Sequence, residues 1–187
     1  MVQFFKQLYL NNFLFYCLIG IILLFTIAYF FPMFYNAAWY LLYILSAFSV
    51  IDILLLFASN KKVIGIRNMA EKLSNGDENE IRIALNNQYT FPVYLKIIDE
   101  IPFQFQKRNF EVKRRIKAQE KDDYKYFLRP TERGEYSFGN LNIYVASPLR
   151  LISRRFTFDN NQMVPTYPSY MQLRKYDLMA FSNNLFQ

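Results

Sequence analysis

Histidine is absent from this chain of 187 residues, and cysteine occurs once, as Cys17. These absences exclude histidine catalysis, histidine metal sites, a disulfide within one chain and a zinc site built from several cysteines. Cys17 lies inside an apolar run, which also argues against a cysteine nucleophile. The five glycines are scattered and form neither a phosphate-binding loop nor a Gly-x-Gly-x-x-Gly turn. We therefore expect no metal and no cofactor.

Charge is almost missing from residues 1–60, in which Lys6 and Asp52 are the only residues of the types Asp, Glu, Lys and Arg. Two apolar runs, Phe13–Phe31 and Trp39–Ala58, each approach the roughly 20 residues that a helix needs to cross a bilayer. They predict an integral, two-pass transmembrane hairpin with helices at about 13–31 and 39–58. The first run is too long for a signal peptide and lacks a small-x-small exit. The remaining alternative is a soluble hairpin buried in a core.

The flanking charges predict the orientation of this hairpin. Lys6 precedes the first run, Lys61 and Lys62 follow the second, and the connecting loop has no basic residue. Because cationic flanks stay on the cytoplasmic side, both termini are expected to be cytoplasmic.

Residues 61–168 alternate between apolar and polar side chains, which predicts a separate domain made of β-strands. Ile81, Ile83 and Leu85 alternate with polar or small residues, which is typical of a half-buried strand. Further strands are predicted at Val63–Arg67, Phe91–Ile98, Tyr124–Arg129, Leu141–Ala146, Ile152–Phe158 and Met163–Tyr167, with weaker candidates at Phe103–Phe110 and Val112–Ala118. Seven or eight short strands separated by turns predict an all-β antiparallel, Ig-like sandwich. Residues 169–187 are expected to begin with a short amphipathic helix capped by Ser169.

One segment of this domain has the residues of a corner between strands. Pro130 cannot donate to a strand ladder, and Gly134 suits a conformation that strains other residues. Tyr136 and Phe138 are expected on one face of the strand that follows. Gly139-Asn140 then forms either a tight hairpin or a bulge.

Several short motifs, in their order along the chain, also carry a resemblance to a known family. They are Asn79-Glu80-Ile81-Arg82-Ile83, Asp99-Glu100-Ile101-Pro102, Arg129-Pro130-Thr131-Glu132-Arg133-Gly134-Glu135-Tyr136, Ser147-Pro148-Leu149, Arg154-Arg155 and Val164-Pro165-Thr166-Tyr167-Pro168. With the apolar hairpin before them, they resemble the N-terminal half of the bacterial domain of unknown function 58 family. Arg150 departs from the pattern, since the family often has glycine after Pro-Leu.

The resemblance implies a bacterial inner (plasma) membrane protein that works beside a MoxR-type AAA+ ATPase and other membrane subunits. The family's von Willebrand factor A-like domain is missing here, so residues 169–187 are expected to lead into an absent domain. The chain is then a truncated form, a fragment or a shortened relative. The family-motif or structural residues are Pro130, Arg133, Gly134, Tyr136, Gly139, Pro148, Leu149, Arg154, Arg155, Tyr167 and Pro168.

Asp52 is the most unusual single residue, because a carboxylate within a transmembrane helix costs about 2.5–3.5 kcal/mol. It could face the partner helix or another membrane protein, with Ser46, Ser49, Thr26 and Tyr16 as hydrogen-bond partners. Alternatively it could reach headgroups or water, since Asn60 and Lys61 lie only two turns on. Proximity to the helix end favours the second interpretation.

The densest basic cluster comprises Lys107, Arg108, Lys113, Arg114, Arg115 and Lys117. It could contact an anionic surface such as lipid. Nearby acids, among them Glu111 and Glu120, flatten its field and favour a solvated hairpin rim instead. We expect no nucleic-acid partner.

Three arginines and four acids complete the candidates. Arg133 is expected to brace the corner before Gly134, and Arg154 and Arg155 to straddle an edge strand, where charge opposes aggregation. Asp99, Glu100, Asp122 and Asp123 lie beside turns, where solvated acids are the default, so no catalytic residue is assigned.

The sequence therefore favours a non-enzymatic, membrane-anchored adaptor or scaffold that recruits protein partners. Two alternatives stay open. One is a structural membrane protein that self-associates through its sandwich, and the other is an enzyme that uses two carboxylates.

Overall fold

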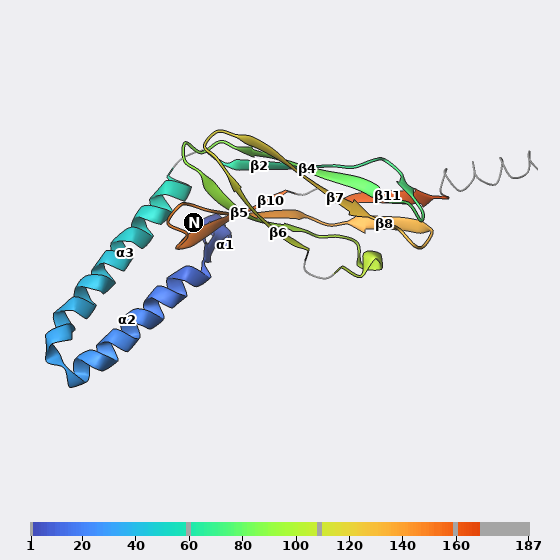
Figure 1. Ribbon diagram of the computed structural model, residues 1–187. Helices are drawn as coiled ribbons and strands as arrows, with labels where there is room; N and C mark the ends of the chain where they lie inside the picture. Colours follow the sequence, from blue (N-terminus) through green and yellow to red (C-terminus); the bar gives the residue numbers. More distant parts are fainter. Residues whose placement is uncertain (1, 59–60, 108–109, 159–160, 169–187) are drawn as a thin grey trace, which may run out of the picture.

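The computed structural model describes residues 2–58, 61–107, 110–158 and 161–168, with side chains from Phe5 onward. A helical hairpin projects from one end of an elongated β-sandwich (Figure 1). The hairpin consists of α2 (Asn12–Phe30) and α3 (Tyr35–Phe57), joined by a 3-10 turn, η1 (Pro32–Phe34). A short helix, α1 (Val2–Gln7), precedes it.

Apart from the ends that meet the sandwich, both long helices are uncovered by the rest of the fold. At about 1.5 Å per residue, the 19 residues of α2 and 23 of α3 span ~28 Å and ~34 Å, which matches a bilayer core of about 30 Å. In α2 only Leu14, Ile21 and Ala28 are buried, at a spacing of seven residues. This stripe faces α3, and most of the other apolar side chains of α2 are exposed or half-buried. Burial in a soluble core of this chain, the alternative interpretation, is therefore wrong.

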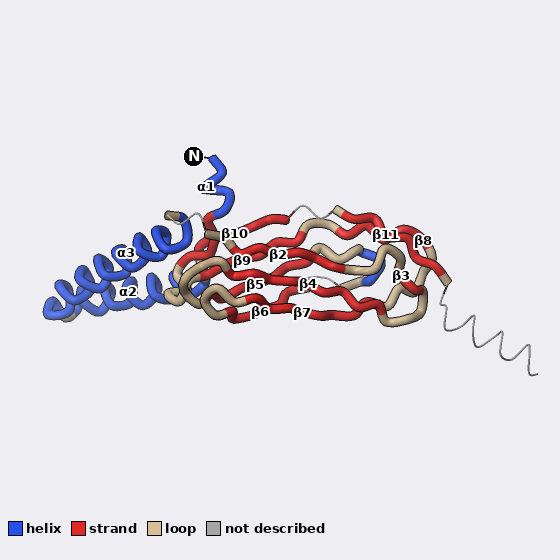
Figure 2. Tube along the Cα trace, turned by 90° about the horizontal axis from the view of Figure 1, so that it is seen from above, coloured by secondary structure: helices blue, strands red, loops and turns tan. Residues whose placement is uncertain are grey.

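The sandwich has two layers of antiparallel strands. One layer is a five-stranded sheet in the order β1 (Leu8–Leu10), β10 (Ile152–Phe158), β9 (Leu141–Ala146), β5 (Val93–Asp99) and β6 (Glu111–Ile116). A second sheet has the order β2 (Val63–Asn68), β4 (Asn79–Asn87) and β7 (Lys121–Leu128). A third has the order β3 (Leu73–Ser74), β11 (Gln162–Tyr167) and β8 (Gly134–Phe138), in which only β3 pairs in parallel. The third sheet lies at the end opposite the hairpin (Figure 2).

The core lies between these layers and has the predicted alternation. Ile81, Ile83 and Leu85 of β4 are buried, as are Leu95 and Ile97 of β5. At Gly65 of β2, an added Cβ would lie 2.4 Å from Cδ1 of Ile143 on β9. The two layers therefore approach so closely at this position that a larger side chain would displace Ile143.

The structure corrects three expectations about the strands. Residues 8–10, placed in the hairpin, form β1 and pair with β10 of the sandwich. Phe103–Phe105, expected within a strand, is a 3-10 turn. Gly139-Asn140 is not a hairpin turn, because β8 pairs with β11 while β9 pairs with β5 and β10. The helix and the lead-in expected at residues 169–187 lie outside the described residues.

Candidate functional site

The turn between β9 and β10 lies against the hairpin. The buried Ser147 shapes this turn, because its Oγ accepts from the Leu149 N–H at 3.0 Å and its carbonyl accepts from the Arg150 N–H at 3.1 Å. Arg150 has φ of +58°, in the left-handed region that favours glycine. The next two backbone N–H groups, of Leu151 and Ile152, consequently point toward α3.

Asp52 of α3 receives these two N–H groups. Its Oδ2 accepts from Leu151 N at 3.0 Å and from Ile152 N at 2.8 Å, and the residue is fully buried. The carbonyl of the same Leu151 accepts from Asn11 N, the N-cap of α2, at 3.0 Å. One peptide segment of the sandwich is thus hydrogen-bonded to both helices of the hairpin.

The end of α3 makes a second attachment. Leu56 O, one of the carbonyls that a helix leaves without an internal partner, accepts from Arg154 Nη1 at 2.8 Å and Tyr89 Oη at 3.1 Å. Arg154 Nε also donates to Gln7 Oε1 at 3.1 Å, and its guanidinium lies 4.8 Å from the Phe57 ring. A cation at a helix C-terminus is further stabilised by the helix dipole. Burial raises the pKa of Tyr89, an effect that Arg154 partly opposes, so the phenol remains a donor.

We call this set the hairpin junction: Asn11, Asp52, Leu56, Tyr89, Leu151, Ile152 and Arg154. Hydrogen bonds to a charged group are worth about 1.5–3 kcal/mol each, and the junction contains several that are shielded from water. The hairpin and sandwich therefore form one connected body whose orientation is set by these contacts.

The junction corrects the interpretations of Asp52. The carboxylate does not reach headgroups or water, since the residue is 0% exposed. Two of its expected partners, Thr26 and Ser49, instead donate to carbonyls of their own helices, at Ile22 and Leu45. Asp52 binds a segment about 100 residues further along the chain, within the same molecule.

The predicted motif residues separate between the two ends of the sandwich. Pro148, Leu149 and Arg154 belong to the junction turn and the strand after it. Arg155 lies beside Arg154 on β10 and donates to Tyr9 Oη at 2.8 Å. The expectation of an edge strand is wrong at Arg154, which pairs with β1 on one side and β9 on the other, whereas Arg155 lies just past the β1 ladder and pairs with β9 alone.

At the opposite end, Tyr136 holds the corner predicted at Pro130–Gly134. Its buried hydroxyl donates to Glu132 O at 3.0 Å, an arrangement that recurs at a corner of Ig-like sandwiches. Arg133, expected to brace this corner, is exposed. Gly134 has φ of +139°, which favours glycine there.

A shallow cleft of about 390 Å³ lies beside this corner, and we call it the distal cleft. Its lining residues are Asn75, Gly76, Arg129, Pro130, Thr131, Arg133 and Pro168. Tyr167, just before Pro168, lies under the Lys72 ammonium at 4.9 Å. Motif residues from two distant segments therefore meet here, on the part of the sandwich farthest from the hairpin (Figure 2).

A buried polar cluster lies within the sandwich. Asp99 accepts from Arg67 Nη1 and from Tyr126 Oη, both at 2.5 Å, and Arg67 Nη2 donates to Gly139 O at 3.0 Å. Burial raises the pKa of Asp99, and Arg67 and Tyr126 partly oppose that rise. The neighbouring Glu100 binds Asn140 N at 2.8 Å.

The remaining candidate acids do not converge with Asp99. Asp123 is exposed, and Asp122 lies beside it on β7. In the described part of the chain, the buried carboxylates Asp52 and Asp99 belong to separate hydrogen-bond networks. No group of three His, Cys, Asp or Glu side chains with the spacing of a metal site occurs among the described residues.

The basic cluster lies on and around the edge strand β6. Lys107, Lys113, Arg114, Arg115 and Lys117 are exposed, while Arg108 is outside the described residues. Arg114 stacks on Tyr124 at 5.0 Å, on the side of the edge that faces β7. Lys113 and Arg115 face the opposite way, toward the outer side of the five-stranded sheet, because they pair with Lys96 and Tyr94.

Sequence reasoning missed several residues of these sites. Tyr89 belongs to the junction and Gln7 binds its Arg154, but neither lies in a motif or a periodic pattern. Arg67 has no predicted role beyond ending the strand Val63–Arg67, although it is buried and paired with Asp99. The alternation of β2, in which Val63, Gly65 and Arg67 share the buried face, was the one available signal for Arg67.

No protein-family model and no curated protein matches this chain. Similar solved structures include the ASH / PapD-like domain of human CEP192 (12% identity, TM-score 0.41, 58% of this chain and 87% of that one). The CARDB domain of a Pyrococcus furiosus protein, in complex with di-metal ions, is 10% identical, with a TM-score of 0.38 over 57% of this chain and 89% of that one. The C-terminal domain of Wzt is also 10% identical, with a TM-score of 0.36 over 59% of this chain and 80% of that one. These scores carry no information about what the chain does.

Proposed function

We propose that this chain is a membrane-anchored adaptor that holds a β-sandwich at the inner leaflet of a bacterial plasma membrane. The hairpin junction is the observation on which this proposal rests. A flexible tether would suffice to localise a domain, but here both helices are hydrogen-bonded to one turn of the sandwich. Such a connection also fixes which surface of the sandwich faces the cytoplasm.

The apolar surface of the hairpin supports a bilayer as its surroundings. Tyr29 and Tyr40 are 83% and 67% exposed near the η1 end, where amphipathic rings favour the membrane interface. The charges of Lys6, Lys61 and Lys62 at the other end support placing both ends of the hairpin on the cytoplasmic side.

The distal cleft is the surface that we propose for the protein partner. Arg129 and Arg133 are exposed on its rim, where guanidinium groups can bind carboxylates in a bidentate manner. Anchoring would raise the partner's local concentration without any new chemistry. The motif resemblance supports a MoxR-type AAA+ ATPase as the partner, with other membrane subunits nearby.

Co-purification of the tagged full chain from bacterial membranes tests this proposal. We expect recovery of an AAA+ ATPase with wild type, and loss of that recovery with Arg129→Glu/Arg133→Glu. Lys125→Glu/Lys121→Glu on β7 is the matched control, because it makes the same charge change elsewhere and should retain the partner.

Three outcomes would contradict the proposal. The first is release of the full chain from membranes by carbonate, and the second is recovery of no partner. The third is a defined homo-oligomer in detergent without other proteins, which would favour the self-associating structural protein.

A further inference from the structure

The outer face of the five-stranded sheet combines cations and tyrosines beside the hairpin. The register places Tyr94 of β5 opposite Arg115 of β6, and Lys96 opposite Lys113. The same rows continue through Tyr144 on β9, with Tyr9 of β1 at the other edge. The side chains alternate in strands, so these residues share one face while the core residues share the other.

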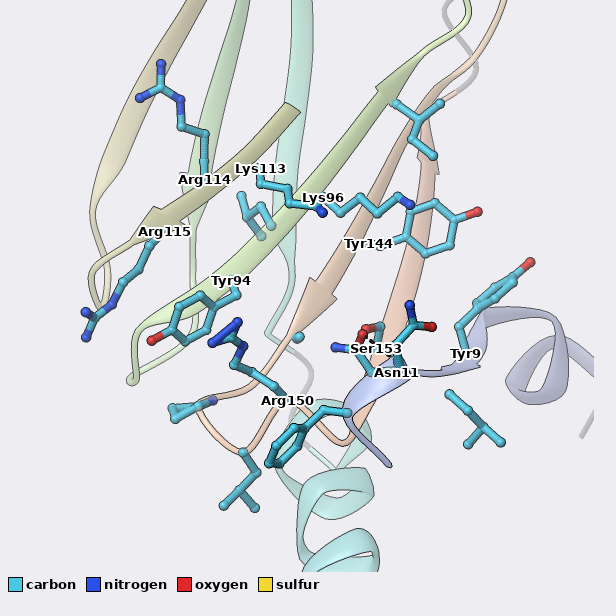
Figure 3. A pocket seen from close by; sticks show the side chains of 18 of the residues that line it. Tyr9, Asn11, Tyr94, Lys96, Lys113, Arg114, Arg115, Tyr144, Arg150 and Ser153 are labelled. Atoms are coloured by element: carbon cyan, nitrogen blue, oxygen red, sulfur yellow. Dashed lines mark hydrogen bonds between the residues drawn. The ribbon is translucent and has the colours of Figure 1, made fainter. Parts of the chain in front are cut away.

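These side chains line a groove of about 960 Å³. Its walls are the outer face of the sheet, the junction turn and the start of α2, where Asn12, Phe13 and Tyr16 contribute. Figure 3 shows Arg115, Tyr94 and Arg150 toward the turn, with Lys113, Lys96 and Tyr144 further along the sheet. The volume lies in the range of about 300–1,000 Å³ typical of small-molecule sites.

The charges in this groove are unbalanced. Glu111 is the only acid that contacts its cations among the described residues, and it binds Lys96 Nζ at 2.7 Å and Lys113 Nζ at 3.4 Å. Arg115 and Arg150 have no carboxylate partner in the described part of the chain. Their guanidinium carbons lie 5.4 Å and 4.5 Å from the ring centre of the same Tyr94.

In Figure 3 the Tyr94 ring lies between the two guanidinium groups, and both cations face the groove without a carboxylate among the described residues, so an anion bound there would offset their charge. The backbone supports a specific role for Arg150, since this residue occupies a left-handed conformation with φ of +58°. Such a position favours glycine, and its occupation by arginine places a second cation over Tyr94.

The position of the groove indicates which anion it would meet. The groove includes the first turn of α2, so in a membrane-spanning hairpin it lies at headgroup level. Phe13 and Tyr16 are 53% and 68% exposed there, and apolar side chains continue along α2. A phosphate in the groove could therefore belong to a lipid whose acyl chains follow the surface of α2.

We propose that this groove binds the phosphate headgroup of an anionic phospholipid. This inference rests on the proposed membrane anchor and adds a lipid-specific contact to it. Arg115 and Arg150 bind the phosphate, Lys96 and Lys113 raise the local potential, and Tyr94 holds the two guanidinium groups in place. Bound lipid would then hold the sandwich against the leaflet in a fixed orientation.

Native mass spectrometry of the full chain in detergent, with equal phosphatidylglycerol and phosphatidylcholine added, tests the site. Wild type should retain phosphatidylglycerol preferentially. Arg115→Gln/Arg150→Gln should weaken that retention about 30-fold, which corresponds to ~2 kcal/mol for two cations near an anionic headgroup. Lys121→Gln/Lys125→Gln on β7 removes the same charge away from the groove and should behave as wild type.

Two further measurements show whether the bound phosphate belongs to a lipid and whether the variants are folded. Excess inorganic phosphate should displace little lipid; complete displacement would indicate a free-phosphate site and overturn the proposal. Equal retention of both lipids by wild type would also overturn it, as would equal loss in both double variants. Unchanged hydrogen exchange at Leu151 would show that the groove variant is folded, and Tyr94→Leu offers a second route to weaken the site.

Carbonate extraction of wild type separates this proposal from the membrane anchor itself. A chain that stays in the membrane but shows no lipid preference refutes the groove alone. A chain that leaves the membrane refutes the anchor.

Discussion

Removing the Asp52 carboxylate should loosen the sandwich from the hairpin without unfolding either. Asp52→Leu leaves the N–H groups of Leu151 and Ile152 buried and unpaired, at about 1–3 kcal/mol each. The substitution also removes the free-energy cost of keeping a carboxylate buried away from water, which offsets part of this destabilisation. We expect local opening to become easier by ~2–3 kcal/mol, or about 30- to 150-fold.

Hydrogen exchange of the Leu151 and Ile152 amides measures this opening directly. With the full chain in detergent, both amides should exchange about 30- to 150-fold faster in Asp52→Leu. Asp52→Asn keeps a neutral acceptor, so a smaller increase of about fivefold is expected, or ~1 kcal/mol. Amides in the middle of β4 should keep their wild-type rates, because the sandwich core is untouched.

Ser49→Ala is the matched control for this experiment. Ser49 lies three residues before Asp52 in α3, and its hydroxyl donates to Leu45 O of the same helix at 2.8 Å. Its removal deletes a polar group without touching the sandwich, so both amides should stay protected. Wild-type exchange rates at Leu151 and Ile152 in a folded Asp52→Leu protein would refute the role assigned to the carboxylate.

Three further predictions concern the sandwich, each measured by unfolding the full chain in detergent. Tyr136→Phe removes the bond to Glu132 O and should lower the free energy of unfolding by about 0.5–1.5 kcal/mol, and an unchanged midpoint would count against the corner. Gly139→Ala places a Cβ 2.8 Å from the Glu100 Cβ and should cost about 1–3 kcal/mol, unless the Glu100 backbone shifts freely. Burial raises the pKa of Asp99, so the native state binds a proton there at higher pH than the unfolded chain does. The stabilisation that comes from this proton is fully present below the unfolded-state pKa and is lost as pH rises through the native-state pKa. Asp99→Asn should remove this pH dependence of the free energy of unfolding. An identical pH dependence in wild type and Asp99→Asn would contradict the prediction.

The helical hairpin and most strands follow from local patterns in the sequence. An uncharged run such as Phe13–Phe31 is long enough to span a bilayer, and in lipid a single segment satisfies its backbone hydrogen bonds as a helix, whatever the rest of the chain does. Strand alternation at Ile81, Ile83 and Leu85 is equally local, because neighbouring side chains point to opposite faces. Both features depend on residues at most a few positions apart, so the printed order of residues is enough to predict them.

The hairpin junction and the groove on the outer face of the five-stranded sheet depend on contacts between distant segments. Asp52 is predictable as an anomaly, but its donors lie about 100 residues away and are brought to it by the pairing of β10 with β1 and β9. The same pairing, rather than composition, makes β1 a strand and puts Arg150 against Tyr94. Such partners are set by the register of whole sheets and the packing of two layers, which no short window of sequence contains.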